Sequence, residues 1–299
     1  MRRPAPRPGQ WGRRLAAALL PLLLTACGTA EPGPEARPAM WLVADADTKI
    51  YILGTMHALP RGTDWDRGRV EDAIEAADEL ILELSPAELD AAGAMFRKLA
   101  PRDAPLAIEA RLSGKALTGF RALEASGRGF GEEGLDDWAV MVLMGQRVAQ
   151  NAGLSSADGV ETGLAKKFKA AGKPVAGFET AREQLMLFET LDPHAQRTLL
   201  TRAAEEADGA VEQVGALTAA WGRGDVAALE KLINEDIDTV PAARKAIITD
   251  RNRRWSAWVK RRMEQPGTVL MAVGAGHLVG ADGVPAMLAA DGLTVTRVQ

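Results

Sequence analysis

The chain has 299 residues, of which 47% are hydrophobic and 25% charged, as expected for a globular protein large enough to bury a sizeable core. The first 26 residues hold five arginines and no acidic residue, so the rest of the chain has 31 basic residues against 40 acidic ones, a net charge of −9. Nucleic-acid binding needs clustered positive charge, and this balance therefore argues against a nucleic-acid partner.

The N-terminus has the parts of an export signal. A basic region that ends at Arg14 is followed by ten mostly apolar residues, which are too few to span a bilayer, since that takes about 20. Leu24-Thr25-Ala26-Cys27 then resembles the lipobox of bacterial lipoproteins, in which cleavage leaves Cys27 as a lipidated N-terminus. Cys27 is the only cysteine in the sequence, so it cannot form an internal disulfide. The alternative is an ordinary cleaved signal with an incidental cysteine.

The segment after the cysteine predicts how the folded part is attached. Residues 27–40 are rich in proline and glycine, which is typical of a flexible or extended tether. We therefore expect a signal peptide over 1–26, a lipidated tether over 27–40 and a folded domain over 41–299. Gly28 follows the cysteine in place of an acidic residue, which by resemblance to Gram-negative sorting indicates the outer membrane, with the domain facing the periplasm. No later run of 18 apolar residues occurs, so the membrane partner is reached through the lipid.

The start of the folded body predicts alternating strands and helices. Residues 41–43 and 49–53 carry β-branched and aromatic residues on either side of a polar turn, which is typical of a β-hairpin. Residues 67–79 have apolar side chains at helical spacing, and residues 79–84 form an apolar run that predicts a buried strand. This β-β-α-β order predicts the beginning of an α/β sheet.

The middle of the chain is mostly helical, and further clear strands come near its end. The elements expected there are helices over most of 87–155, over 158–170 and over 181–264, a short strand in 172–179, a buried strand at 268–273, a helix at 284–290 and a last strand at 293–298. The predicted fold class is α/β (α+β). Its central sheet is built from the N- and C-terminal parts of the chain, with a helical block at about 87–265 inserted between them.

Two of the three histidines follow a predicted strand in the same short pattern. These are Gly54-Thr55-Met56-His57 and Gly274-Ala275-Gly276-His277. Loops at the carboxyl ends of strands are where α/β sheets place ligands, and histidine is both a neutral-pH acid or base and a common metal ligand. If adjacent strands carry both loops, the imidazoles converge. The third histidine, His194, is at an expected helix start and is interpreted as structural.

Glutamates occupy comparable positions. Glu83 and Glu179 end predicted strands, and Glu161 lies near the start of a predicted helix. Two imidazoles and a carboxylate, His57, His277 and Glu83, are a donor set for Zn²⁺, Mn²⁺, Co²⁺ or Fe²⁺ with open positions for water. Such a metal lowers the pKa of bound water, and Glu161 or Glu179 is then available as a general base. The alternative is that these residues are hydrogen-bonded structural groups at strand ends.

The densest basic run of the folded body lies at residues 250–255. If Arg251 and Asn252 point inward, the arginine can form paired hydrogen bonds with a carboxylate of the site or the substrate. The alternative is a solvated helix face. We include both residues in the candidate site, where they would orient substrate or a developing oxyanion.

Several motifs in one order resemble the TraB/GumN family. They are residues 51–57, 82–84, 159–164, 172–185, 221–225, 251–255 and 273–295. The family includes the Tiki-type proteins, described as metalloproteases, and the resemblance implies a wider kinship with erythromycin-esterase (EreA)-like and haem-binding ChaN-like folds. It also implies a site made of the paired Gly-x-x-His motifs, a glutamate and the arginine-asparagine pair. It implies no substrate.

These observations favour two functions over a third, that of a structural or regulatory partner protein at the envelope. The first is a metal-dependent hydrolase, peptidase-like, that cleaves a peptide or similar small amide at the cell envelope. The second is a non-catalytic envelope lipoprotein that binds haem, a metal or a peptide in the same cleft. Both need the two imidazoles to converge. Shared ligands of one metal would place His57 Nε2 and His277 Nε2 about 3–5 Å apart, whereas a separation above about 10 Å would contradict both functions.

Overall fold

A computed structural model of the chain describes residues 33–299, except for the side chains of residues 234–236. The predicted signal peptide, Cys27 and the first part of the predicted tether lie outside the described residues. In the described part, no helix is long and apolar enough to cross a membrane.

A six-stranded mixed sheet forms the centre of the fold, in the order β6-β4-β7-β2-β1-β8. The strands are β1 (Met40–Ala44), β2 (Thr48–Thr55), β4 (Glu79–Leu84), β6 (Val175–Glu179), β7 (Gly267–Gly274) and β8 (Val295–Arg297). The predicted hairpin is confirmed, because β1 and β2 pair antiparallel. Strands β2, β7, β4 and β6 are mutually parallel, so their carboxyl ends meet at one edge. β2 and β7 are neighbours, so the two Gly-x-x-His loops begin side by side.

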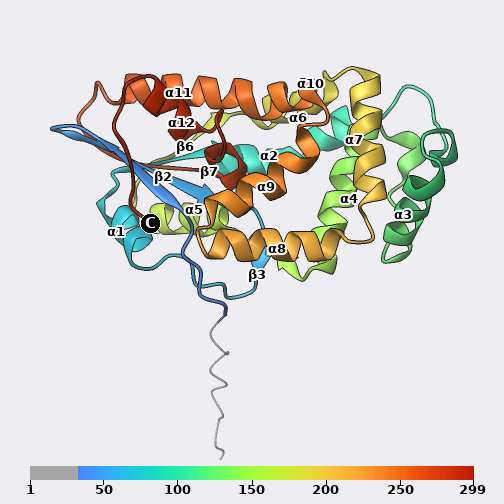
Figure 1. Cartoon of the computed structure of the whole chain (residues 1–299), viewed down its shortest axis with the longest axis horizontal. Helices are drawn as coiled ribbons and strands as arrows, with labels where there is room; N and C mark the ends of the chain where they lie inside the picture. Colours follow the sequence, from blue (N-terminus) through green and yellow to red (C-terminus); the bar gives the residue numbers. More distant parts are fainter. Residues whose placement is uncertain (1–32) are drawn as a thin grey trace, which may run out of the picture. The chain divides into compact units, whose positions relative to one another are not determined.

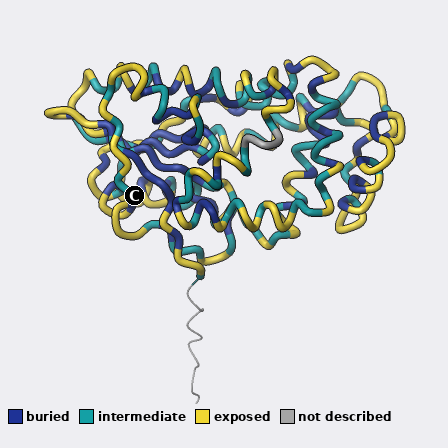
Figure 2. Tube along the Cα trace, in the orientation of Figure 1, coloured by how far each residue is buried: buried dark blue, intermediate teal, exposed yellow. Residues whose placement is uncertain are grey.

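Helices cover both faces of this sheet (Figure 1). On one face lie α1 (Arg69–Ala76), α5 (Val160–Ala170), α8 (Ala210–Gly222) and α9 (Val226–Ile237). On the other lie α11 (Asp250–Arg262) and α12 (Val284–Ala290). Figure 2 shows the strands as the most continuously buried part of this unit. A strand that is covered on both faces has a nearly continuous apolar sequence, which is why such strands can be predicted from the sequence.

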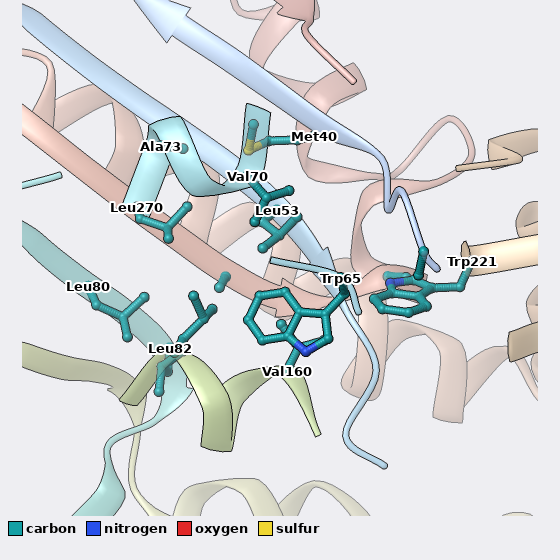
Figure 3. Packing of buried hydrophobic residues seen from close by; sticks show 14 of the residues in the cluster. Met40, Leu53, Trp65, Val70, Ala73, Leu80, Leu82, Val160, Trp221 and Leu270 are labelled. Carbon is teal, nitrogen blue, oxygen red and sulfur yellow. The ribbon is translucent and has the colours of Figure 1, made fainter. Parts of the chain in front are cut away.

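The pleat of the strands divides their side chains between two cores. On β7, Leu270 packs with the α1 and α5 side, whereas Val269 and Met271 pack with α11 and α12. Figure 3 shows the first core, in which Leu53 of β2 lies near Val70 of α1 and Leu270 of β7 lies near Ala73 of the same helix. This alternation follows from the two-residue period of a strand, and it holds the strand ends rigidly in place.

The remaining helices form most of the inserted block. They are α2 (Pro86–Leu99), α3 (Gly114–Ala125), α4 (Asp137–Asn151), α6 (Ala181–Glu189), α7 (Pro193–Glu205) and α10 (Pro241–Arg244), with short turns η1 (Ile108–Ala110), η2 (Glu132–Gly134) and η3 (Ser156–Asp158) and a small ladder of β3 (Leu59–Pro60) with β5 (Leu154–Ser155). Helices α3, α4 and α7 share an apolar core of their own. The predicted fold class is confirmed, with one refinement. Strand β6 lies inside the block yet forms an edge of the central sheet.

The described end of the predicted tether differs from expectation. Ala36 is 3% exposed, and its N–H donates to the Asp64 carbonyl at 2.8 Å. The next N–H, of Arg37, donates to the Gly222 carbonyl at 2.7 Å, and Met40 already begins β1. Residues 36–40 therefore belong to the folded domain. A proline-rich run has no periodicity that would predict this, because its partners are distant in sequence.

Candidate functional site

The candidate residues gather at the edge where the parallel strands end. His57 follows β2 by two residues, Glu83 lies near the end of β4, and Glu179 is the last residue of β6. His277 lies in the short helix η5 (Ala275–Leu278), which directly follows β7. This is the edge at which α/β sheets place ligands.

The two Gly-x-x-His motifs meet beside Gly274. The position that a Cβ atom of Gly274 would occupy is 3.1 Å from Glu83 Oε1, 3.7 Å from His57 Nε2 and 3.7 Å from His277 Cδ2. Because His57 Nε2 and His277 Cδ2 each lie 3.7 Å from this position, they cannot be further apart than twice that distance. The histidine rings therefore flank one glycine, closer than the about 10 Å that would contradict a shared site.

His57 is open to the cleft and held from behind by Glu161. Its Nδ1 lies 2.7 Å from Glu161 Oε1, to which the Thr55 hydroxyl also donates. The Glu161 carboxylate raises the pKa of His57 to about 10, although 70% of the imidazole side chain is accessible and solvent screens the pair. Within residues 33–299, His57 Nε2 has no hydrogen-bond partner, so this atom is available in the cleft.

Helix α5 brings Glu161 to His57 through a close backbone contact. The Val160 N–H donates to the Met56 carbonyl at 3.1 Å. A Cβ on Gly159 would lie 2.2 Å from the His57 carbonyl oxygen, so only glycine lets the helix start this close to the loop. Gly159 is thus a site residue that was not among the predicted site residues, although the motif at 159–164 begins with it, two residues before Glu161.

Glu83 is buried, and both of its carboxylate oxygens accept hydrogen bonds. Its Oε1 accepts from the Gly274 N–H at 2.8 Å, and its Oε2 accepts from Arg251 Nη2 at 2.5 Å and from Gln184 Nε2 at 3.0 Å. Burial raises the pKa of Glu83, but the charge of Arg251, with His57 and the Gly274 N–H, outweighs it and holds the pKa well below its usual range. The carboxylate is therefore ionised at neutral pH. Gln184, on α6, was not among the predicted site residues.

Arg251 is the central cation of the site. It is 4% exposed, and its Nε lies 2.9 Å and 3.1 Å from the two oxygens of Glu179, while Nη2 reaches Glu83. Its guanidinium also stacks over Trp255 at 4.7 Å. The structure thus places Arg251 inward, bridging two strand-end carboxylates. A π-helical turn η4 (Lys245–Thr249) precedes it, a feature often found beside functional sites and one with no sequence signal.

His277 is buried with both ring nitrogens engaged. Asn252 Nδ2 donates to the carbonyls of His277 at 3.2 Å and Asp282 at 2.8 Å, which leaves Asn252 Oδ1 as an acceptor for His277 Nδ1 at 2.7 Å. His277 Nε2 therefore accepts from Arg251 Nη1, at 2.9 Å. Burial lowers the pKa of His277 to about 3, so the ring is neutral. Asn252 thus sets the tautomer of His277.

Comparison with known proteins finds one family whose sequence pattern matches the chain. The model of the TraB/PrgY/gumN family matches residues 39–297, which include both Gly-x-x-His motifs, the three glutamates and the arginine-asparagine pair. The chain belongs to the TraB/PrgY/gumN family. No curated protein and no solved structure matches it. The family expected from the sequence is therefore confirmed, while the kinship with Tiki-type proteins and erythromycin esterases stays a prediction.

The residues of this TraB/PrgY/gumN chain fit a divalent metal at two of the three predicted ligands. His57 Nε2 and Glu83 Oε1 both lie close to Gly274. His277 does not fit as it stands, because its Nε2 already accepts from Arg251. Accordingly, residues 33–299 contain no group of three histidine, cysteine or acidic side chains arranged to hold a metal. The full three-ligand set stays a prediction that requires Arg251 to withdraw.

A small cavity of about 220 Å³ opens at this point of the family fold. The residues that line it are His57, Glu83, Leu84, Leu89, Ser156, Glu161, Thr162 and Gln184. Glu179, Arg251 and Asn252 are absent from this lining, so they act from behind the site. Sequence reasoning missed Leu89 of α2, Thr162 of α5 and Gln184 of α6, because helices far apart in the chain meet there.

The opposite pKa shifts of the two histidines predict a stability maximum near pH 6.5. Unfolded histidine titrates near 6.5, and the pKa of folded His277 is about 3, so between these values the unfolded chain binds more protons and stability falls as pH drops. The pKa of folded His57 is about 10, so the stability from its protonated form is complete below 6.5 and is lost as pH rises towards 10.

Urea unfolding from pH 5 to 9 measures this dependence. His57→Gln should flatten the alkaline limb and His277→Gln the acidic limb. The exposed His194→Gln is the matched control and should leave both limbs unchanged. A wild-type profile that is flat over this range would contradict the assignment.

Proposed function

We propose that this TraB/PrgY/gumN chain is a metal-dependent hydrolase that cleaves a peptide or a similar amide. The observation that carries the proposal is the convergence of His57 Nε2 and Glu83 Oε1 on one small cavity, beside Gly274. An accessible imidazole and an ionised carboxylate that face each other suit a cation and a water molecule. Glu161 and Arg251 support the pair from behind.

His57 and Glu83 are the residues that would hold the divalent ion, which is Zn²⁺, Mn²⁺, Co²⁺ or Fe²⁺. When bound, such an ion lowers the pKa of water and polarises a carbonyl oxygen. His57 must lose its proton to become a ligand, and Glu161 raises the pKa of that proton. We therefore expect metal affinity to rise with pH through the alkaline range.

The protein's own groups have separable roles in this proposal. Glu161 orients His57 through Nδ1 and lines the cavity, so of the two predicted bases it is the one placed to accept a proton from water. Glu179 bonds to Arg251 and Arg254 and does not line the cavity, which makes it a positioning residue. Arg251 keeps Glu83 ionised and fixed rather than contacting substrate.

Turnover by the full-length chain tests the proposal. A mixed peptide library incubated with Mn²⁺, Zn²⁺ or Co²⁺ and read by mass spectrometry should show cleavage, and His57→Ala and Glu83→Gln should each lower kcat/KM by at least about 100-fold. His194→Ala changes an exposed histidine on α7 and should keep wild-type activity. Elemental analysis that finds no stoichiometric metal, or the absence of cleavage with every metal, would contradict the proposal.

Non-catalytic haem binding is the second candidate. The observation that favours it is the open Nε2 of His57, which could serve as an axial ligand. Its test is haem titration followed by absorbance. A Soret band that disappears in His57→Ala would support haem binding, whereas an unshifted spectrum of free haem would exclude it.

We also propose that Cys27 carries the lipid that anchors the chain to the outer membrane, facing the periplasm. The support is the sequence Leu24-Thr25-Ala26-Cys27 followed by Gly28. Several acyl chains at about 0.8 kcal/mol per buried CH₂ give firm attachment. Radiolabelled palmitate should enter the wild-type chain and not Cys27→Ser, and fractionation should move that variant out of the membrane pellet.

A further inference from the structure

A second, larger cavity continues from the small one along α5. Its volume is about 590 Å³, and it shares Leu89, Glu161 and Thr162 with the cavity at His57. Its other walls are the start of α2, further residues of α5, and Lys173 and Val175, which follow α5. A substrate that reaches His57 can therefore extend into this space.

Three lysines line the larger cavity, and two of them have no protein partner among the described residues. Lys166 and Lys169 line it, and within residues 33–299 neither ammonium group has a hydrogen bond or an ion pair. Lys167, between them, points elsewhere and pairs with Asp66 at 2.6 Å. The third lining lysine, Lys173, donates to carbonyls at the end of α1.

The rest of the cavity also favours negative charge. The first turn of the 14-residue helix α2, at Pro86 and Ala87, faces it, and a helix N-terminus attracts anions. Asp90 is the one acidic residue of the described lining apart from Glu161, whose carboxylate is already bonded to His57.

The helix geometry sets the distance between the cations and the reaction. Lys166 and Lys169 follow Glu161 by five and eight residues on α5, which at 1.5 Å per residue is about 7–12 Å along the axis. An extended peptide advances about 3.3–3.6 Å per residue. The cations therefore lie about two to four substrate residues from His57.

We propose that Lys166 and Lys169 form an anion subsite that binds a carboxylate of the substrate two to four residues from the cleaved amide. This inference rests on the proposed hydrolase function, which makes the small cavity at His57 the place where the amide is cleaved. The carboxylate is either an acidic side chain or the free C-terminus of the peptide. Lysines near the end of a helix also stabilise its dipole, but that role does not require them to line a cavity.

Equilibrium binding tests the subsite without turnover. The probes are N-acetylated hexapeptides, Ala-Leu-Ala-Ala-Glu-Ala and its Gln counterpart, each with a free or an amidated C-terminus, titrated calorimetrically into the metal-free full-length chain. At low salt we expect the peptides with a carboxylate to bind about five- to ten-fold more tightly than the neutral amide, and the preference to shrink as salt rises. The side-chain and terminal arms identify which carboxylate is bound.

The double variant Lys166→Gln/Lys169→Gln should reduce the preference to less than about two-fold. Lys167→Gln removes the same charge from the same helix outside the cavity and is the matched control, which should keep the preference. Equal binding of all peptides, failure of every peptide to bind, or a preference that survives in the double variant would overturn the subsite. Charge-selective binding without cleavage of any peptide would support the subsite and contradict the hydrolase.

Discussion

Replacing Arg251 by methionine should lower the free energy of unfolding by about 3–5 kcal/mol. The guanidinium is 4% exposed and bonds to Glu83, Glu179 and His277, so its loss leaves two buried carboxylates without their cation. Methionine keeps an aliphatic side chain against Trp255, which limits the loss of packing. Urea denaturation at pH 7 measures the change.

Arg254→Met provides the matched control. Arg254 also bonds to Glu179, at 3.1 Å, but its side chain is 55% exposed, and we expect a change of less than about 1 kcal/mol. Adding Glu83→Gln and Glu179→Gln to Arg251→Met should recover part of the lost stability, because no buried charge then remains unpaired. A loss below about 1 kcal/mol for Arg251→Met would show that solvent reaches the two carboxylates.

The second large effect is expected from Gly274→Ala, which should abolish metal binding and lower kcat/KM by at least about 100-fold. The added methyl group would lie 3.1 Å from Glu83 Oε1 and 3.7 Å from His57 Nε2, in the space between the proposed ligands. The backbone of Gly274, with φ −49° and ψ 134°, suits alanine. We therefore expect the unfolding free energy to change by no more than about 1–2 kcal/mol.

Gly54→Ala is the control in the paired motif. Its methyl group would meet Ala275 at 3.4 Å, an ordinary contact that is remote from the donor atoms. Metal affinity by calorimetry and turnover of the peptide library should stay near wild type in this variant. If Gly274→Ala keeps wild-type metal affinity, the ion does not lie between His57 and Glu83.

Local patterns were sufficient for most secondary structure. The strand that carries Glu83 was predicted because a buried strand is an apolar run of limited length. The packing of residues 36–40 on the domain was not predicted. It depends on partners such as Asp64 and Gly222, which are far away in sequence.

The candidate site shows the same division. The shared Gly-x-x-His pattern was enough to single out His57 and His277, and the strand ends singled out the glutamates. The pattern assigned both histidines one role, but the structure gives them different surroundings. His57 is accessible and paired with Glu161, whereas His277 is buried and hydrogen-bonded on both ring nitrogens.

By itself, the sequence determined the family, the strands and the residue types that meet at one sheet edge, because these depend on local periodicity and on motifs at strand ends. Only the tertiary structure decided which of those residues are open to the cleft and which are buried and hydrogen-bonded. Whether a histidine leaves a ring nitrogen open to the cleft depends on what its ring contacts, a carboxylate at Nδ1 for His57 and a guanidinium at Nε2 for His277. Those partners come from α5 and α11, about 100 and 26 residues away, and no local pattern encodes that meeting.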